Sequence, residues 1–386
     1  MRYTEAYAGT EFDAHLSYVI YDHSLTSGDY VVNRQFYLDL ARSGLRMPIG
    51  ADLVLHEKPD PDAILRDGEA LGRVVEETAR RYRTPLAFAH MDLSLEKTVL
   101  LEILGVPVAD IPLYHFGGDP GPEAAGRVKE GLRKSLNPAL HAHIDSVGYI
   151  TRNTDLVPIG MTIGPFSLMT KLLKDPITPI YLAGSGMTAE DDPDVALMER
   201  ALELSLLIVL HSVAAQIQAG AKAIFMAEPA ANVVYVSPKQ IEAGSGVFER
   251  YPIASDRRVK ALLDQHGVDL IFHCCGELND YMVRQFTTLE PVILSLGSSR
   301  KLWEDARIVP KDIVLFGNLP SKHFYSDAVI TREQVEQRAC ELLDRMGQAG
   351  HPFILGSECD VLNVPGSTAV IRGKVDAFVG CRCAAK

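Results

Sequence analysis

The chain has 386 residues, of which 47% are hydrophobic and 23% are charged, and these fractions exclude disordered, collagen-like and low-complexity proteins. A formal net charge of −12 without a basic run argues against a nucleic-acid partner. The N-terminal MRYTEAYAGTEFD lacks the apolar segment of a signal peptide. The apolar stretch Ala201 to Ala215 is interrupted by Glu203 and His211 and is too short to span a membrane. We therefore expect a cytoplasmic protein with no membrane partner.

The first 60 residues are polar and aromatic and show no clear helical or strand period. We expect residues 1–60 to form an N-terminal extension that packs on the rest of the chain or on a second subunit, which makes a homodimer one option. Residues 115–146 are expected to form an irregular insertion, because they open with the breaker-rich run Gly117–Pro122.

Short apolar runs and longer amphipathic segments alternate along the remainder of the chain. The runs read as strands covered on both faces, and the segments have a helical period. The expected strands are Pro85–His90, Val157–Ile163, Ala221–Ala227, Val268–His273, Pro291–Leu296, Asp312–Phe316 and Pro352–Leu355. The expected helices include Ala63–Arg81, Asp194–Ala219, Ala254–Gln265 and Thr331–Ala349.

A strand-then-helix repeat with right-handed crossovers forms either a doubly wound sheet or a closed (β/α)8 barrel. No G-x-G-x-x-G follows the first expected strand, which removes the usual evidence for a dinucleotide-binding sheet. Polar residues follow several strands, and in a barrel all those strand ends open on one face. We therefore predict an α/β fold, a (β/α)8 TIM barrel over residues 61–386. Seven strands are found, so one of the eight is missed or misread.

The strongest local signal is IFHCCGE, which runs from Ile271 to Glu277. In extended backbone His273 and Cys275 point to the same side, and Cys359 follows another strand-like run. Two thiolates and one imidazole form a zinc ligand set that leaves a fourth position open for chemistry. The alternative is that these cysteines are small buried hydrophobic residues.

The other metal-competent residues are given structural roles. Cys274 should face away from its two neighbours, Cys340 should be a core residue within a helix, and the terminal Cys381 and Cys383 lie on a poor scaffold near the chain end. His141 and His143 form an H-x-H pattern, but the preceding SLNPAL makes a poor strand, so a solvated or capping role is expected.

Several segments together resemble the uroporphyrinogen decarboxylase superfamily of (β/α)8 barrels, over residues 60 to 380. The resemblance is carried, in chain order, by MDLSLEKTVLLEILG, GMTIGPFSLMTKLL, GAKAIFMAEPAANVVYVSPKQIE, FHCCGELND, VLFGNLP and GSECDVLNVPGST. These segments are most similar to the corrinoid-linked methyltransferases of that superfamily, which include methylcobamide:coenzyme M methyltransferase and the methyltransferases of O-demethylation.

The resemblance implies zinc at His273, Cys275 and Cys359. It also implies transfer of a methyl group between a small molecule, either a thiol such as coenzyme M or a methoxylated compound, and a corrinoid (cobalamin). The corrinoid is expected on a separate protein, because this chain lacks a D-x-H-x-x-G motif. Glu228 is a candidate fourth ligand, general acid or helix-capping carboxylate, and Asp92 and Asn318 are candidates for orienting the substrate. His90 and Glu96 are weaker candidates.

The alternative within the same superfamily is a decarboxylase of the uroporphyrinogen type. Two differences between this chain and the decarboxylases argue against it. The arginine-rich N-terminal signature is missing, and NRQFYLDLAR at Asn33–Arg42 is a poor substitute. Lys171 stands where the decarboxylases carry a tyrosine. Cofactor-free decarboxylation also has no use for three zinc ligands. A non-catalytic barrel, or another kind of zinc barrel, is the third option.

Overall fold

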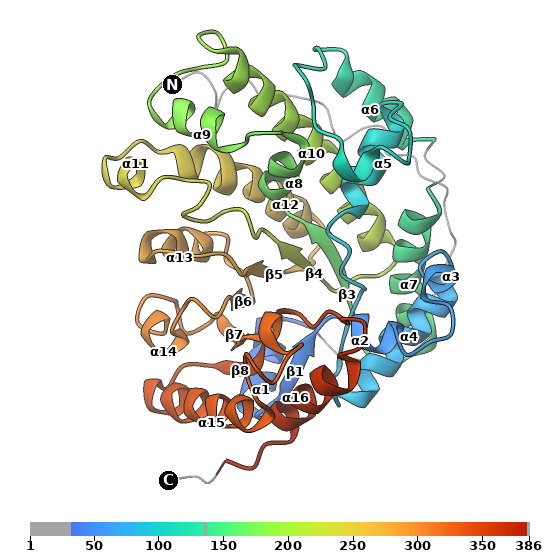
Figure 1. Cartoon of the computed structure of the whole chain (residues 1–386), viewed down its shortest axis with the longest axis vertical. Helices are drawn as coiled ribbons and strands as arrows, with labels where there is room; N and C mark the ends of the chain where they lie inside the picture. The colour runs from blue at the N-terminus through green and yellow to red at the C-terminus, as the bar shows by residue number, and fades with distance from the viewer. Residues whose placement is uncertain (1–31, 135–136, 384–386) are drawn as a thin grey trace.

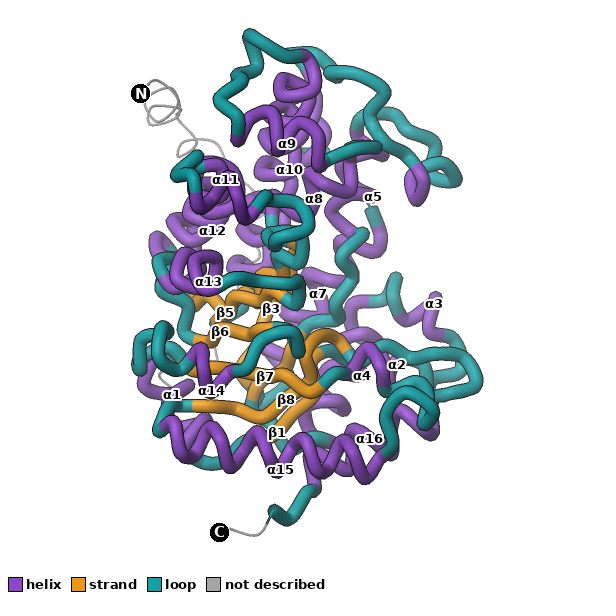
Figure 2. The backbone as a smooth tube through the Cα atoms, turned by 60° about the vertical axis from the view of Figure 1, so that its left-hand side comes forward, coloured by secondary structure: helices purple, strands orange, loops and turns teal. Residues whose placement is uncertain are grey.

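A sheet of eight parallel strands surrounded by helices forms the centre of the molecule (Figures 1 and 2). The computed structural model describes residues 32–134 and 137–383. The strands are β1 (Arg46–Ile49), β2 (Leu86–Phe88), β3 (Val157–Ile163), β4 (Ala223–Ala227), β5 (Asp269–Cys274), β6 (Ile293–Leu296), β7 (Val314–Leu319) and β8 (Phe353–Asp360). Their order is β1-β8-β7-β6-β5-β4-β3-β2, so the sheet curls into a barrel whose seam lies between β1 and β2. The predicted (β/α)8 fold is confirmed.

Helices follow the strands and cover the outside of the barrel. The longer ones are α1 (Arg34–Arg42), α4 (Gly68–Arg81), α5 (Leu95–Ile103), α6 (Ala124–Leu132), α7 (Pro138–Asn153), α8 (Pro165–Leu172), α9 (Ile177–Gly184), α10 (Pro193–Gln218), α12 (Ala254–Gln265), α13 (Asp280–Thr287), α15 (Arg332–Ala349) and α16 (Thr368–Gly380). Short turns of helix are α2 (Asp52–Leu55), α3 (Pro61–Ile64), α11 (Pro238–Glu242), α14 (Leu302–Asp305), η1 (Ile111–Leu113), η2 (Glu249–Ile253) and η3 (Ser321–His323).

The strand that the sequence did not reveal is β1. It has only four residues, RMPI, and it contains Pro48, which cannot donate a backbone hydrogen bond. β1 pairs with β8 on one side and lies at the barrel seam on the other, and an edge is where a strand tolerates proline. The sheet of the barrel therefore includes residues 46–49, which fall within the expected N-terminal extension of residues 1–60.

The described part of the predicted extension packs on the barrel. Residues 1–31 lie outside the described residues. Helix α1 lies against the amino-terminal ends of the strands. Arg34 donates to the backbone oxygens of Glu290 at 2.8 Å and of Pro291 and Asp312 at 3.0 Å, just before β6 and β7. Tyr37 on the same helix is fully buried.

The expected irregular insertion at residues 115–146 is largely helical. It holds α6 and the first half of α7, and Asn137 caps α7 by accepting a hydrogen bond from the backbone nitrogen of Leu140 at 2.9 Å. An Asn-Pro pair is a normal start of a helix, since proline suits its first turn, and the breaker-rich run Gly117–Pro122 that predicted a loop ends before α6 begins.

Helix α10 is longer than the apolar stretch considered in the sequence, and by length and composition it would suffice to cross a membrane. Half of its most apolar window is buried against the rest of the protein. It packs on β3 and on α5 to α9 and α12, as the core helix of a large barrel does.

Candidate metal centre

The imidazole of His273 lies in the barrel interior near the carboxyl end of β5. Alternation along β5 turns His273 inward, where its ring lies 5.2 Å from that of Phe225 on β4. Its Nδ1 is 2.8 Å from the hydroxyl of Ser295 on β6. Its Nε2 is buried, and the described residues offer it no hydrogen-bond partner. With Nδ1–H donated to Ser295, Nε2 has a free lone pair for a metal.

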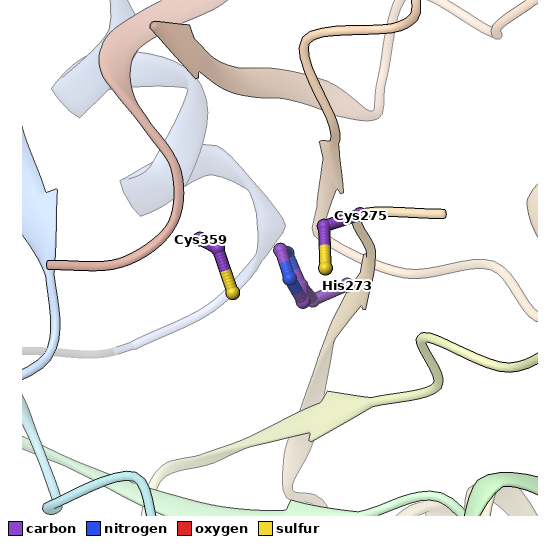
Figure 3. A group of neighbouring side chains, drawn as sticks. All are labelled: His273, Cys275 and Cys359. Atoms are coloured by element: carbon purple, nitrogen blue, oxygen red, sulfur yellow. The ribbon is translucent and has the colours of Figure 1, made fainter. Parts of the chain in front are cut away.

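Two cysteine sulfurs meet this nitrogen, as Figure 3 shows. Cys275 follows β5 directly, and Cys359 comes from β8. The ligand atoms of His273, Cys275 and Cys359 all lie within 4.8 Å of one another. Cys274 is fully buried on the opposite side of the strand, with its sulfur 3.7 Å from the backbone oxygen of Ala231. The tertiary fold therefore brings together the three residues that the sequence predicted as ligands, from strands more than 80 residues apart.

The electrostatics around Cys275 favour its thiolate. The largest cause is the hydrogen bond with the Cys359 thiol, which lowers the pKa of Cys275, while burial opposes this and His273 and Lys322 add to it. Lys322 lies in η3, with its ammonium nitrogen 3.5 Å from the backbone oxygen of Cys275. Burial acts against the charged form of Lys322, but Cys275, Glu358 and Cys359 together outweigh it and the pKa of the ammonium is raised.

These side chains fit a zinc ion. The set contains two soft sulfur ligands and one imidazole, the spacing allows them to share one ion, and a buried imidazole nitrogen without a partner is explained by a metal ligand role. Three protein ligands leave the fourth position for a substrate atom.

The family model for uroporphyrinogen decarboxylase (URO-D) matches residues 98–369, from α5 to the start of α16. The chain belongs to this family. Among solved structures, a methyltransferase from Methanosarcina mazei has a TM-score of 0.61 at 15% sequence identity, and the match covers 90% of this chain and 97% of that chain. At this level of identity the likeness shows a shared fold. No curated protein matches the sequence.

In this URO-D family barrel, Glu228 faces the helix layer. It follows β4 and is fully buried, and its Oε1 accepts a hydrogen bond from the backbone nitrogen of Ser167 in the first turn of α8 at 2.5 Å. Burial raises the pKa of Glu228 to about 7 and raises that of its neighbour Asp256 well above the usual range. The position matches the capping alternative for Glu228, because a carboxylate satisfies free backbone N–H groups at a helix start.

Asp92 and Asn318 are both engaged in holding loops. Asp92 is exposed before α5, and its Oδ1 accepts hydrogen bonds from the backbone nitrogen of Ser94 at 2.8 Å and from its hydroxyl at 2.6 Å. Asn318 on β7 is buried, and its amide donates to the backbone oxygens of Gly297 at 2.7 Å and Arg300 at 2.9 Å. Asn318 thus shapes the loop after β6 at the barrel mouth, whereas Asp92 stabilises a turn.

The two weaker candidates, Glu96 and His90, are both buried, but only Glu96 has hydrogen-bond partners among the described residues. Glu96 is buried in the helix layer, where it accepts hydrogen bonds from Thr162 at 2.9 Å and Ser212 at 3.2 Å. His90 follows β2, and its Nδ1 is buried with no hydrogen-bond partner among the described residues. His143 is also buried, 3.1 Å from the backbone oxygen of Met161, so the solvated or capping role expected for it is wrong.

Two residues of the centre escaped the sequence analysis. Ser295 is an ordinary serine in the apolar run PVILSL, and Lys322 lies in η3, the short helical turn after β7. Neither belongs to a motif with the metal ligands. The only available signal was their position near the carboxyl ends of barrel strands, where functional residues gather.

The cysteines near the chain end also differ from expectation. Cys340 was expected to be a core residue and Cys383 to lack a defined scaffold, yet the two form a disulfide. Cys381 is buried beside them.

Proposed function

We propose that this URO-D family barrel is a zinc-dependent methyltransferase that moves a methyl group between a small substrate and a corrinoid carried by a separate protein. The observation that carries the proposal is the convergence of His273, Cys275 and Cys359, with an unpartnered imidazole nitrogen, at the mouth of the barrel. The substrate would be a thiol or a methoxylated compound, and the protein would act in the cytoplasm.

The residues around the centre have definite tasks in such a reaction. Ser295 holds the ring of His273 with Nε2 facing the two sulfurs. Lys322 places a positive charge near the sulfurs of Cys275 and Cys359, which favours binding of a further anionic atom such as a substrate thiolate. When bound, zinc supplies Lewis acidity toward the sulfur or oxygen that gains or loses the methyl group. The rigid strand ends hold the substrate in line with the methyl group, and such positioning supplies much of the rate in a displacement reaction.

The decisive experiment combines metal analysis with a transfer assay. The protein would be purified, its zinc content measured, and methyl transfer followed by absorbance with methylcobalamin and thiols, and with cob(I)alamin and methoxylated aromatics. We expect zinc at the barrel mouth and transfer in one of the two directions. Cys359→Ser should lose both that zinc and the activity.

Cys274→Ser is the matched control, because its sulfur faces away from the centre and its loss should leave zinc and transfer intact. Full zinc retention by Cys359→Ser would remove Cys359 from the site. Decarboxylation of a porphyrinogen by the zinc-free protein, without any corrinoid, would overturn the proposal in favour of a decarboxylase.

A further inference from the structure

Three cysteines form a second cluster at the end of the chain, away from the barrel mouth. Cys340 lies on α15, and Cys381 and Cys383 follow α16, which packs beside α15 (Figure 1). Their three sulfurs lie within 4.8 Å of one another. Cys340 and Cys383 form a disulfide, and the sulfur of Cys381 is 3.5 Å from that of Cys383.

The surroundings hold this cluster in place. Cys381 has only 5% of its surface exposed. The guanidinium of Arg46, the first residue of β1, lies 2.9 Å from the sulfur of Cys381 and donates a hydrogen bond to its backbone oxygen. The cluster therefore connects α15, the end of α16 and the first strand of the barrel.

We propose that Cys340, Cys381 and Cys383 form a second metal site, which takes up zinc once a dithiol has reduced the disulfide. In the reduction the sulfur–sulfur bond between Cys340 and Cys383 breaks, and the dithiol supplies two electrons and two protons and becomes a cyclic disulfide. Zinc then binds the three sulfurs, and their protons pass to solvent.

The geometry suits this ion. Zinc–sulfur bonds of about 2.3 Å in tetrahedral arrangement place the sulfurs about 3.8 Å apart. The Cys381 and Cys383 sulfurs are already 3.5 Å apart, so mainly the Cys340 and Cys383 sulfurs must separate. Cys381 lies directly after α16, at φ −58° and ψ 136°, so the helix has ended where the two C-terminal cysteines begin. Either the disulfide or the metal would join α15 to the segment that follows α16, and Arg46 connects that segment to β1.

The test uses the full chain with the barrel-mouth ligands removed, as His273→Ala/Cys359→Ser, so that its result does not depend on the proposed activity. The protein is reduced with dithiothreitol, desalted without oxygen and titrated with zinc against a chromophoric chelator. We expect one tightly bound zinc per chain. Cobalt in its place should give the strong near-ultraviolet absorption of thiolate ligands.

Adding Cys381→Ser or Cys383→Ser to that background should abolish the tight binding, and adding Cys274→Ser should not. Oxidised protein should bind no zinc until it is reduced. The proposal is overturned if the reduced His273→Ala/Cys359→Ser protein binds no zinc, or if its zinc binding survives the added Cys381→Ser substitution. Failure of the barrel-mouth centre would give a different pattern: Cys381→Ser on an otherwise unchanged chain would then bind no zinc at all.

Discussion

At the scale of single residues, the candidate metal centre depends on the residues that hold His273, Cys275 and Cys359 as much as on these three residues themselves. One ring nitrogen of His273 is fixed by Ser295, and the other faces two sulfurs. Lys322 adds a positive charge next to Cys275. These two contacts give separate, measurable predictions about zinc binding.

Removal of the Ser295 hydroxyl should weaken zinc binding without removing a ligand. In Ser295→Ala the imidazole of His273 loses the partner that fixes its orientation and tautomer, so we expect zinc affinity to fall about 10-fold to 100-fold. Competition with a chelator measures this directly, and Ser295→Thr should restore much of the affinity. Ser205→Ala removes an equally buried hydroxyl, one that bonds within α10, and should leave affinity unchanged. Equal zinc affinity in Ser295→Ala and wild type would contradict the role of the hydroxyl.

Loss of the Lys322 charge should make zinc binding more sensitive to acid. Lys322 lowers the pKa of Cys275, so its removal raises that pKa and lets protons compete better with the metal. In Lys322→Met the pH at which half the zinc is released should rise by about 0.5 to 1 unit. Lys322→Arg, which keeps the charge, should behave like wild type. A half-release pH in Lys322→Met equal to or below that of wild type would show that the charge does not act on the centre.

At the scale of elements, the junction between β3 and α8 shows how a buried carboxylate organises a helix start. Glu228 reaches from the end of β4 to the backbone of Ser167, and it occupies the space beside Gly164 at the end of β3. A Cβ atom at Gly164 would lie 2.1 Å from Oε2 of Glu228. A Cβ atom at this position would therefore displace the buried Glu228 carboxyl group, although the backbone at φ −71° would suit any residue.

We predict that Gly164→Ala destabilises the protein by about 1 to 3 kcal/mol, because the Glu228 side chain must move from its helix-capping position. Urea unfolding monitored by circular dichroism measures the change. Gly126→Ala is the matched control: that glycine lies within α6 with open space around its Cβ direction, and alanine there should stabilise by up to about 1 kcal/mol. A stability loss in the control as large as that in Gly164→Ala would show that the contact with Glu228 is not the cause.

At the scale of the whole molecule, buried carboxyl groups in the helix layer make folding depend on pH. Burial raises the pKa of Glu96 from 4.5 to about 7. The folded state therefore holds a proton between pH 4.5 and 7 that the unfolded state has released, and stability falls as the pH rises through this interval. Below pH 4.5 the protein keeps all of this pH-dependent stability, and above pH 7 it has lost it.

Glu96→Gln should remove this dependence. Relative to wild type, the free energy of unfolding of the variant should rise by about 3 kcal/mol between pH 4.5 and 7, since each unit of pKa shift corresponds to about 1.4 kcal/mol. Urea unfolding at several pH values measures it. Glu341→Gln, on the exposed face of α15, changes the net charge equally and should follow wild type. A constant difference between Glu96→Gln and wild type over this range would contradict the prediction.

Local patterns determined most of the barrel and the identity of the three candidate ligands. Seven apolar runs predicted seven strands, because strands covered on both faces are nearly continuously hydrophobic. The spacing of His273 and Cys275 placed both side chains on one side of β5. β1 escaped because four residues with a proline carry too little signal, and α6 and α7 escaped because glycines and prolines around their starts read as loop.

Only the tertiary structure decided which polar residues face the centre. Asp92, Glu228 and Asn318 all follow or end strands, but Glu228 caps α8, Asp92 holds a turn and Asn318 supports the loop after β6. Ser295 and Lys322 enter the centre from separate strand ends, and Cys340 meets Cys383 across 43 residues. Sequence periodicity reports which side of a strand a residue occupies, whereas the partners of that residue depend on how distant segments pack, and closure of the barrel sets that packing.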